Sequence, residues 1–209
     1  LFCGNSGTTI RFLTAIATLG QGAFRLDGVP RMRQRPIGDL LAALEQLGAD
    51  ARAEMQNNCP PVVVHAHGLP GGVARLQAHV SSQFLSGLLM ATPCADNPVE
   101  LTVDGALVSK PYVRMTMAVM RDFGVQVECD DQQSSYRVSP AQYVAREYAV
   151  EPDASAASYF WAAAAITGGK VSVAGLSSGS LQGDVAFVDA LARMGCAISH
   201  DHEEISVTG

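Results

Sequence analysis

The segment Leu101-Thr102-Val103-Asp104-Gly105 has the pattern of a short apolar strand that stops at a glycine. Two other segments share this pattern, Phe24-Arg25-Leu26-Asp27-Gly28 and Val171-Ser172-Val173-Ala174-Gly175. An amphipathic helix pattern follows each segment and ends at a glycine; these helix-end glycines are Gly48, Gly124 and Gly195. Both sets of glycines recur after roughly 70 to 77 residues, so we infer an internal repeat of three units.

In each unit, a helix start rich in small polar residues follows the first strand, and two short strands end the unit. The helix starts are Asn5-Ser6-Gly7-Thr8-Thr9, Ser81-Ser82-Gln83 and Asp153-Ala154-Ser155. The predicted order in each unit is β-α-β-α-β-β, a small α/β module. The helices over residues 84–90 and 159–166 are apolar almost all round, which predicts burial on every side, with Trp161 in the core.

The end of the second unit carries a clear strand pattern. Val125, Val127 and Cys129 alternate with polar residues, which predicts a half-buried strand. We expect a turn over residues 130–134 and a further strand over residues 136–138.

A polar stretch bracketed by Pro140 and Pro152 predicts a linker between two lobes. Residues 1–150 would hold two repeat units, and residues 151–209 would begin a second lobe with one unit. Fifty-nine residues are few for a stable core, and the strand before Asn5 is cut to Leu1-Phe2-Cys3. We therefore expect that both ends of the chain are truncated.

Composition excludes several classes of protein. The chain has 209 residues, of which 48% are hydrophobic, and its net charge of −6 argues against nonspecific nucleic-acid binding. The apolar runs fall short of a membrane span, and no secretory leader pattern is present. Five cysteines without a C-x-x-C pair favour reduced, mostly buried thiols in a cytoplasmic protein, with neither disulfides nor a metal site.

The helix starts suggest the chemistry. Helix N-termini bind anions, and three or more around one cleft would hold an acidic, hydroxylated small molecule. Simple N-capping explains a single such start, but Gly4 and Gly7 beside four polar residues exceed what a cap requires. We expect Gly7 to leave the backbone bare so that a ligand can approach it. The segment is neither a P-loop nor a dinucleotide-binding turn.

Other polar segments lie at the junctions between strands and helices. Arg31-Met32-Arg33-Gln34-Arg35-Pro36 places three arginines where they can point at an anion, with Pro36 in the first helical turn; a solvated basic loop is the alternative. In Ser109-Lys110-Pro111-Tyr112, we expect Ser109 to cap a helix and Tyr112 to offer a hydroxyl, although Tyr112 could equally be a core residue. Segment 180–184 is expected to be a simple cap.

The histidine pairs His65/His67 and His200/His202 each lie on one strand face. A metal site needs further ligands, so we interpret all four as surface residues of strands. The sequence predicts neither a metal nor an organic cofactor.

Six segments together resemble the 5-enolpyruvylshikimate-3-phosphate synthase family, also called 3-phosphoshikimate 1-carboxyvinyltransferases. They fall in the family's order across the whole chain: residues 4–11, 30–38, 81–85, 108–112, 153–160 and 182–184. The resemblance implies the two-lobed inside-out α/β barrel of the enolpyruvyltransferases, with three units per lobe, present here incompletely. It also implies a monomeric full-length enzyme without a cofactor, of the kind that is the target of glyphosate.

By this resemblance, the reaction is transfer of the enolpyruvyl group from phosphoenolpyruvate to the 5-hydroxyl of shikimate 3-phosphate, with release of phosphate. The implied shikimate 3-phosphate ligands are Ser81, Ser82, Gln83, Ser109 and Tyr112. The implied phosphoenolpyruvate ligands are Gly7, Arg35, Gln83, Asn5 and Arg11.

The chain also departs from the family pattern. Family members are about twice as long, and the segments that supply their acid and base carboxylates lie outside this sequence. Phe12 stands where many members have Pro, and Ser6 replaces a common Ala. We expect the chain alone to hold half an active site and not to turn over. A non-catalytic anion-binding module and a ligand-free repeat protein are the alternatives; Arg35 and Ser81-Ser82-Gln83 argue against the second.

Overall fold

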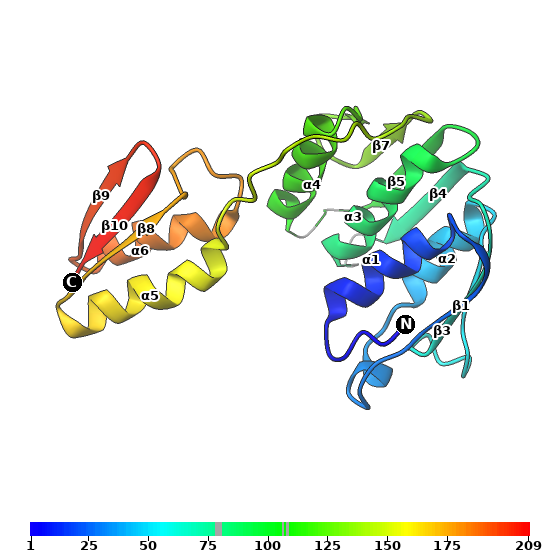
Figure 1. The fold of residues 1–209 in the computed structure, drawn as a ribbon, viewed down its shortest axis with the longest axis horizontal. Coiled ribbons are helices and arrows are strands. Elements are labelled where there is room, and N and C mark those ends of the chain that lie inside the picture. Colours follow the sequence, from blue (N-terminus) through cyan, green and yellow to red (C-terminus); the bar gives the residue numbers. More distant parts are fainter. Residues whose placement is uncertain (78–80, 106, 108) are drawn as a thin grey trace. The chain divides into compact units, whose positions relative to one another are not determined.

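The computed structural model describes residues 1–77, 81–105, 107 and 109–209. The chain divides into two units, Leu1–Ala145 and Arg146–Gly209, each with its own hydrophobic core (Figure 1). Residues 139–153 form neither helix nor strand, and the boundary between the units lies within this stretch. The boundary expected from the sequence, after residue 150, lies five residues beyond the observed one, after Ala145.

The described residues of unit 1 form four helices and seven strands. The helices are α1 (Gly7–Ala17), α2 (Gly38–Gln46), α3 (Ser82–Ala91) and α4 (Lys110–Asp122), and short 3₁₀ turns occur at Met32–Gln34 and Thr92–Cys94. The strands are β1 (Gln21–Leu26), β2 (Asp50–Ala53), β3 (Val62–His67), β4 (Gly72–Gln77), β5 (Val99–Asp104), β6 (Glu128–Cys129) and β7 (Ser135–Val138).

Unit 2 is smaller and has the same kind of architecture. Its helices are α5 (Ala154–Thr167) and α6 (Phe187–Arg193), with a 3₁₀ turn at Gly183–Ala186. Its strands are β8 (Lys170–Ala174), β9 (Ala197–Asp201) and β10 (Glu204–Thr208).

The repeat predicted from the glycines is confirmed by the sheet topology. The strand orders are β4-β5-β7-β6, β1-β3-β2 and β8-β10-β9. In the first sheet β4 runs parallel to β5, and the other neighbours are antiparallel. A parallel bridge from Phe2 to Asp27 takes the place of β4 beside β1. The predicted β-α-β-α-β-β order is complete in β4-α3-β5-α4-β6-β7, and the three sheets form no closed barrel within the described residues.

The helix ends follow the sequence signals closely. Gly48, Gly124 and Gly195 have φ values of +86°, +88° and +104°, the left-handed conformation that ends a helix and favours glycine. The amphipathic pattern predicted before Gly48 forms α2, and its apolar residues Leu40 and Leu44 are fully buried.

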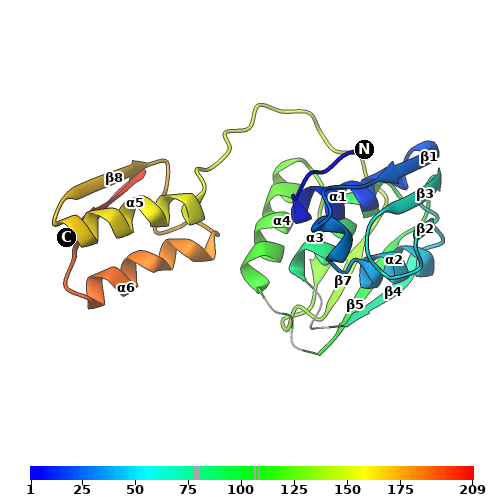
Figure 2. The ribbon, with the colours of Figure 1, turned by 90° about the horizontal axis from the view of Figure 1, so that it is seen from below.

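Helix α3 lies between α1 and α4 and is buried on nearly all sides (Figures 1 and 2). This confirms the prediction for residues 84–90. The same prediction is wrong for residues 159–166, because α5 buries one face only, including Trp161, while Tyr159, Phe160 and Ile166 are 78%, 62% and 84% exposed. The difference has a simple cause: α3 has a helix packed on each side, and α5 contacts mainly its own sheet and the segment 183–193.

Two further expectations are corrected. The strand predicted over residues 125–129 is reduced to Glu128–Cys129, because only these two residues pair with β7, and Cys129 is exposed. The cysteines are also not mostly buried. All five are free thiols as expected, but Cys3 alone is buried. Its burial raises the pKa of the Cys3 thiol. The turn before β7 forms as predicted, with the amide of Ser134 donating to Asp130 Oδ1 at 2.7 Å.

None of the helices in the described part of the chain has the length and apolar character that a membrane crossing requires.

Candidate functional site

The first turns of α1 and α3 lie side by side in unit 1. Each is capped by a serine: Ser6 Oγ accepts from the amide of Thr9, and Ser81 Oγ accepts from the amide of Gln83. The positive ends of two helix dipoles therefore point the same way, which favours a negative charge there.

A chain of side-chain hydrogen bonds joins these two helix starts. Arg11 Nη1 donates to Gln83 Oε1 at 2.6 Å, and Gln83 Nε2 donates to Thr8 Oγ1 at 2.9 Å. Arg11 also reaches Ser81 Oγ at 3.5 Å and lies 4.8 Å above the centre of the Phe84 ring. Both ends of the Gln83 amide are thus held, and Arg11 is fixed beside the start of α3.

Arg35 approaches the same place from the loop between β1 and α2. Its Nη1 donates to the backbone carbonyl of Asn5 at 3.2 Å. Its guanidinium fills the space next to Gly7, where an added Cβ would lie 2.6 Å from Arg35 Cζ. In this structure the space left by the missing side chain of Gly7 holds Arg35, and the approach of a ligand to the Gly7 backbone stays a prediction.

The electrostatics of this cluster favour an anion. Burial lowers the pKa of Arg11, and the nearby positive charge of Arg35 lowers it further. Among the described residues, neither arginine forms an ion pair with a carboxylate. Arg11, Arg35 and the N-termini of α1 and α3 therefore lie close together, and no carboxylate of the described residues neutralises the two arginines.

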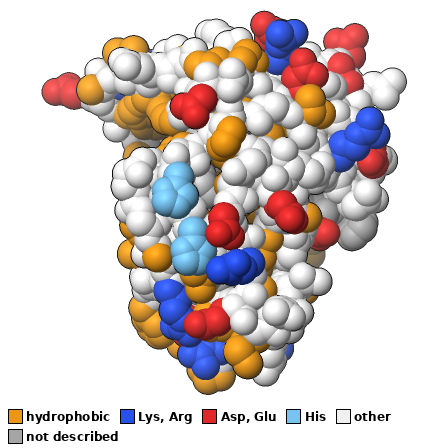
Figure 3. All heavy atoms as spheres, turned by 90° about the vertical axis from the view of Figure 1, so that its right-hand side faces the viewer, with side chains coloured by type: hydrophobic (Ala, Val, Ile, Leu, Met, Phe, Trp, Pro, Cys, Tyr) orange, Lys and Arg blue, Asp and Glu red, His pale blue; other side chains and the backbone are white. Residues whose placement is uncertain are grey.

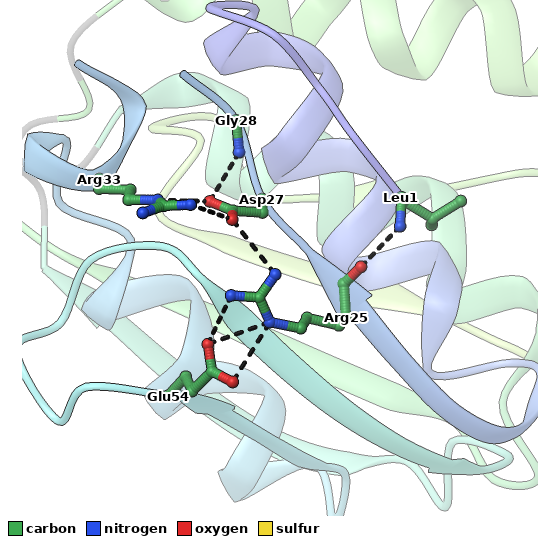
Figure 4. Close-up of polar contacts among 6 residues, drawn as sticks. All are labelled: Leu1, Arg25, Asp27, Gly28, Arg33 and Glu54. Carbon is green, nitrogen blue, oxygen red and sulfur yellow. Dashed lines mark hydrogen bonds and ion pairs between the residues drawn. The ribbon is translucent and has the colours of Figure 1, made fainter. Parts of the chain in front are cut away.

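The other two arginines of the loop do not join this cluster. Arg33 binds Asp27 through Nε at 2.9 Å and Nη2 at 2.6 Å (Figure 4). Arg31 donates to Gln34. The predicted group of three anion-facing arginines is therefore reduced to Arg35. Pro36 also lies outside the first helical turn, since α2 begins at Gly38.

The residues of the second predicted ligand set lie on α3 and α4. Ser82 is buried in the first turn of α3, and Ser109 and Tyr112 lie at the start of α4. One turn further, Thr116 Oγ1 donates to Ser86 Oγ at 2.8 Å, so α3 and α4 begin at the same end. Ser109 does not cap α4 as expected, because its left-handed backbone, with φ of +63°, leaves it without a side-chain cap bond.

In unit 2, side chains of the protein accept hydrogen bonds from the free amides at the start of α5. Asp153 Oδ1 accepts from the amides of Ser155 and Ala156, and Gln182 Oε1 accepts from the amide of Ala154. Ser155 Oγ donates to Asp184 Oδ2. Carboxylates thus occupy the positive end of α5, in contrast to α1 and α3.

Three of the four predicted surface histidines lie on strands, but the expectation is wrong for His202, which lies in the turn between β9 and β10. His67 is exposed and His65 is half-buried on β3, where His65 Nε2 and Arg52 Nη2 are 3.1 Å apart. This face of unit 1 carries acidic, basic and histidine side chains together (Figure 3). His200 and His202 are also exposed.

Sequence reasoning missed three residues that build the site: Thr8, Phe84 and Asp27. Thr8 and Phe84 hold Gln83 and Arg11, and they were hidden inside segments interpreted as caps and core. Asp27 carried a usable signal, since an acid just before an arginine-rich loop is a candidate ion-pair partner.

Comparison with known proteins identifies the family of this chain. The family model for EPSP synthase (3-phosphoshikimate 1-carboxyvinyltransferase) matches residues 1–209. A chloroplastic 3-phosphoshikimate 1-carboxyvinyltransferase of Arabidopsis thaliana is 50% identical over all of this chain and 41% of its own length. The enzyme of that name from Marinomonas sp. is 49% identical, over 96% of this chain and 47% of its own length.

The fold also matches a solved structure. An EPSP synthase from Acinetobacter baumannii aligns with a TM-score of 0.78 and 23% identity, over all of this chain and 48% of that one. The chain thus spans less than half the length of these relatives. On the family model, which matches from end to end, the chain belongs to the EPSP synthase family.

Proposed function

We propose that this chain supplies the main anion-binding surface of a 3-phosphoshikimate 1-carboxyvinyltransferase. The observation that carries the proposal is the cluster at the starts of α1 and α3, where Arg11 and Arg35 meet two helix N-termini. Both substrates of the proposed reaction, shikimate 3-phosphate and phosphoenolpyruvate, are anions. The family match supports this assignment over a generic phosphate site.

Shikimate 3-phosphate would bind along α3 and α4. Ser81, Ser82 and Gln83 would face its phosphate at the start of α3, and Ser109 and Tyr112 would contact it from α4. Backbone N–H groups and hydroxyls at a helix start are suited to phosphate oxygens. Residues 1–145 would then form part of the lobe that binds this substrate, and residues 146–209 would begin the second lobe.

Phosphoenolpyruvate would bind on the α1 side. Arg35 and Arg11 would face its charged groups, with Gln83 between the two substrates and with Asn5 and Gly7 shaping the turn. Guanidinium groups bind carboxylate and phosphate through paired hydrogen bonds. The ligand would meet cations that are already held in place by neutral partners, which lowers the cost of organising the site.

The chain by itself would bind the substrates without converting them to product. Transfer of the enolpyruvyl group requires an acid and a base near the reacting atoms, and we assign neither role to a residue of this chain. A non-catalytic anion-binding module of the same fold is the second candidate, favoured by the same cluster. Adding a polypeptide equivalent to the remainder of the relatives decides between them: phosphate release on mixing supports the enzyme.

Calorimetric titration of the chain with shikimate 3-phosphate tests the proposal, with unphosphorylated shikimate as the matched ligand. We expect saturable binding that requires the phosphate. A folded chain that binds neither ligand, or both equally, contradicts the proposed site. Relatives from plants are named chloroplastic; the cytoplasmic location, the monomeric state and the lack of nucleic-acid binding stay predictions.

A further inference from the structure

Asp27 lies at the junction between β1 and the arginine loop, which we define as residues 28–35. Its Oδ1 accepts from Arg33 Nε at 2.9 Å and from the amide of Gly28 at 2.8 Å. Its Oδ2 accepts from Arg33 Nη2 at 2.6 Å and from Arg25 Nη1 at 3.2 Å (Figure 4). The side chain is 11% exposed, so a nearly buried carboxylate holds Arg33 through two parallel bonds.

The backbone at Asp27 connects the arginine loop to the turn before α1. The amide of Cys3 donates to the Asp27 carbonyl at 2.7 Å, and the amide of Val29 donates to the Gly4 carbonyl at 3.0 Å. A Cβ at Gly28 would collide with that same Gly4 carbonyl, so only glycine permits this approach. The loop and the Asn5–Gly7 turn are therefore held together at Asp27.

The loop is short and internally bonded between Asp27 and Arg35. The amide of Met32 donates to Val29, and the amide of Arg35 donates to Met32, whose side chain is fully buried. A shift of Arg33 away from Asp27 would thus be transmitted to Arg35, two residues later. Within the described part of the chain, the one hydrogen bond of the Arg35 side chain goes to the carbonyl of Asn5, a neutral partner that leaves its charge uncompensated.

We propose that Asp27 is a positioning residue for the phosphoenolpyruvate side of the site. It removes Arg33 from competition for the anion and fixes the arginine loop so that Arg35 alone lies beside Gly7. This inference rests on the proposed function and deepens it by naming a residue that contacts neither substrate. It also explains why a loop with three arginines presents one to the site.

The alternative to a positioning role is that the Asp27–Arg33 ion pair merely stabilises the fold. Exposed pairs contribute little, and Arg33 is 52% exposed. The two roles differ in what they do to the two ligands. A stabilising pair affects both binding sites through folding, whereas a positioning residue affects the site of Arg35 and spares the start of α3.

The test compares Asp27→Asn with Glu54→Gln in the 209-residue chain. Both remove one carboxylate from the same network, since Arg25 bridges Asp27 and Glu54, but Glu54 does not contact the arginine loop (Figure 4). Calorimetry measures the affinities for phosphoenolpyruvate and shikimate 3-phosphate. Hydrogen exchange measures the opening of the Val29, Met32 and Arg35 amides, which are bonded within the loop or to Gly4.

For Asp27→Asn we expect an approximately tenfold loss of phosphoenolpyruvate affinity, faster exchange at the three amides, and shikimate 3-phosphate affinity within about twofold. Glu54→Gln should change none of these. Equal losses for both ligands, or no change in the loop, overturn the inference. An unsubstituted chain that binds neither anion contradicts the proposed function instead, and the exchange rates still decide whether Asp27 holds the loop.

Discussion

At the scale of single residues, the contact between Arg35 and Gly7 decides how an anion meets the chain. The guanidinium lies where a side chain at position 7 would be, and its only bond to the Asn5–Gly7 turn is one donated to the Asn5 carbonyl. A methyl group at position 7 would therefore displace a flexible, charged side-chain end without disturbing α3.

We predict that Gly7→Ala weakens phosphoenolpyruvate binding by about 10- to 100-fold, the range expected for losing hydrogen bonds to a charged group. Shikimate 3-phosphate binding should change much less. Calorimetry with each ligand measures both. Gly87→Ala is the matched control, because an added Cβ there meets its nearest neighbours at 3.4 Å, an ordinary contact. Equal losses for both ligands in Gly7→Ala would refute the role of Arg35.

The pH dependence of stability should report on Asp27. Its hydrogen bonds with Arg33 lower its pKa from 3.8 to about 2, and the Gly28 amide acts in the same direction. Since the folded pKa lies below the unfolded one, the carboxylate stabilises the fold fully above pH ~4 and loses this effect as the pH falls toward 2.

We therefore predict that the chain and Asp27→Asn differ in urea midpoint by a constant amount above pH ~5. The difference should shrink below pH ~4 and vanish only below pH ~2, where Asp27 is protonated in both the folded and the unfolded state. Other carboxylates with lowered pKa values, such as Asp130, are common to both proteins and cancel in the comparison. A difference that does not shrink between pH ~4 and pH ~2 would contradict the assignment.

Residue patterns alone did not distinguish Arg31, Arg33 and Arg35, and among these three the family resemblance singled out Arg35. In the folded chain, the positions of Gln34, Asp27 and Asn5 separate the roles of the three arginines. Such pairings depend on contacts between β1 and the loop, so they are a property of the folded chain.

At the scale of secondary structure elements, the site depends on α1 and α3 starting side by side. Gln83 bridges them through Arg11 and Thr8, and it is neutral. A carboxylate of the same size would keep a bond to Arg11 and could accept from the Thr8 hydroxyl. It would, however, place a negative charge in the anion site.

We predict that Gln83→Glu lowers the affinity for both ligands by about tenfold or more, because a negative charge a few ångströms away repels each anion. Thermal stability should change little, since the bridge between the helices persists. The same substitution at the exposed Gln126 serves as a control and should affect neither ligand. Unchanged affinities in Gln83→Glu would show that the anions bind elsewhere.

The repeat made most elements predictable. Strand-end and helix-end glycines located the strands and helices of all three units, and the sheet orders agree with one another. Burial was less predictable, because an apolar helix is buried only where partners exist. Residues 84–90 have α1 and α4 beside them, whereas the equivalent helix α5 exposes Tyr159 and Phe160.

At the scale of the whole molecule, the two units have separate cores. Leu44 is fully buried in unit 1, and Trp161, the single tryptophan of the chain, is fully buried in unit 2. Tryptophan fluorescence therefore reports on unit 2, while most of the helix signal in circular dichroism comes from the four helices of unit 1.

We predict that Leu44→Ala destabilises unit 1 by about 2 to 5 kcal/mol, the cost of a cavity in a packed core. Its denaturation midpoint by circular dichroism should fall, while the midpoint by Trp161 fluorescence stays as in the unsubstituted chain. Coincident shifts in both signals would mean that the two cores unfold as one cooperative unit.

Anions should bind where Arg35, Arg11 and the starts of α1 and α3 meet. Nuclear magnetic resonance of the labelled chain, titrated with shikimate 3-phosphate and then phosphoenolpyruvate, locates the binding site residue by residue. We expect saturable shifts at the Ser82 and Gln83 amides with the first ligand. The second should shift the Arg35 and Arg11 side chains, while Arg52 and His67 remain unchanged. Saturable shifts confined to other residues, or none in a folded chain, would contradict the claim.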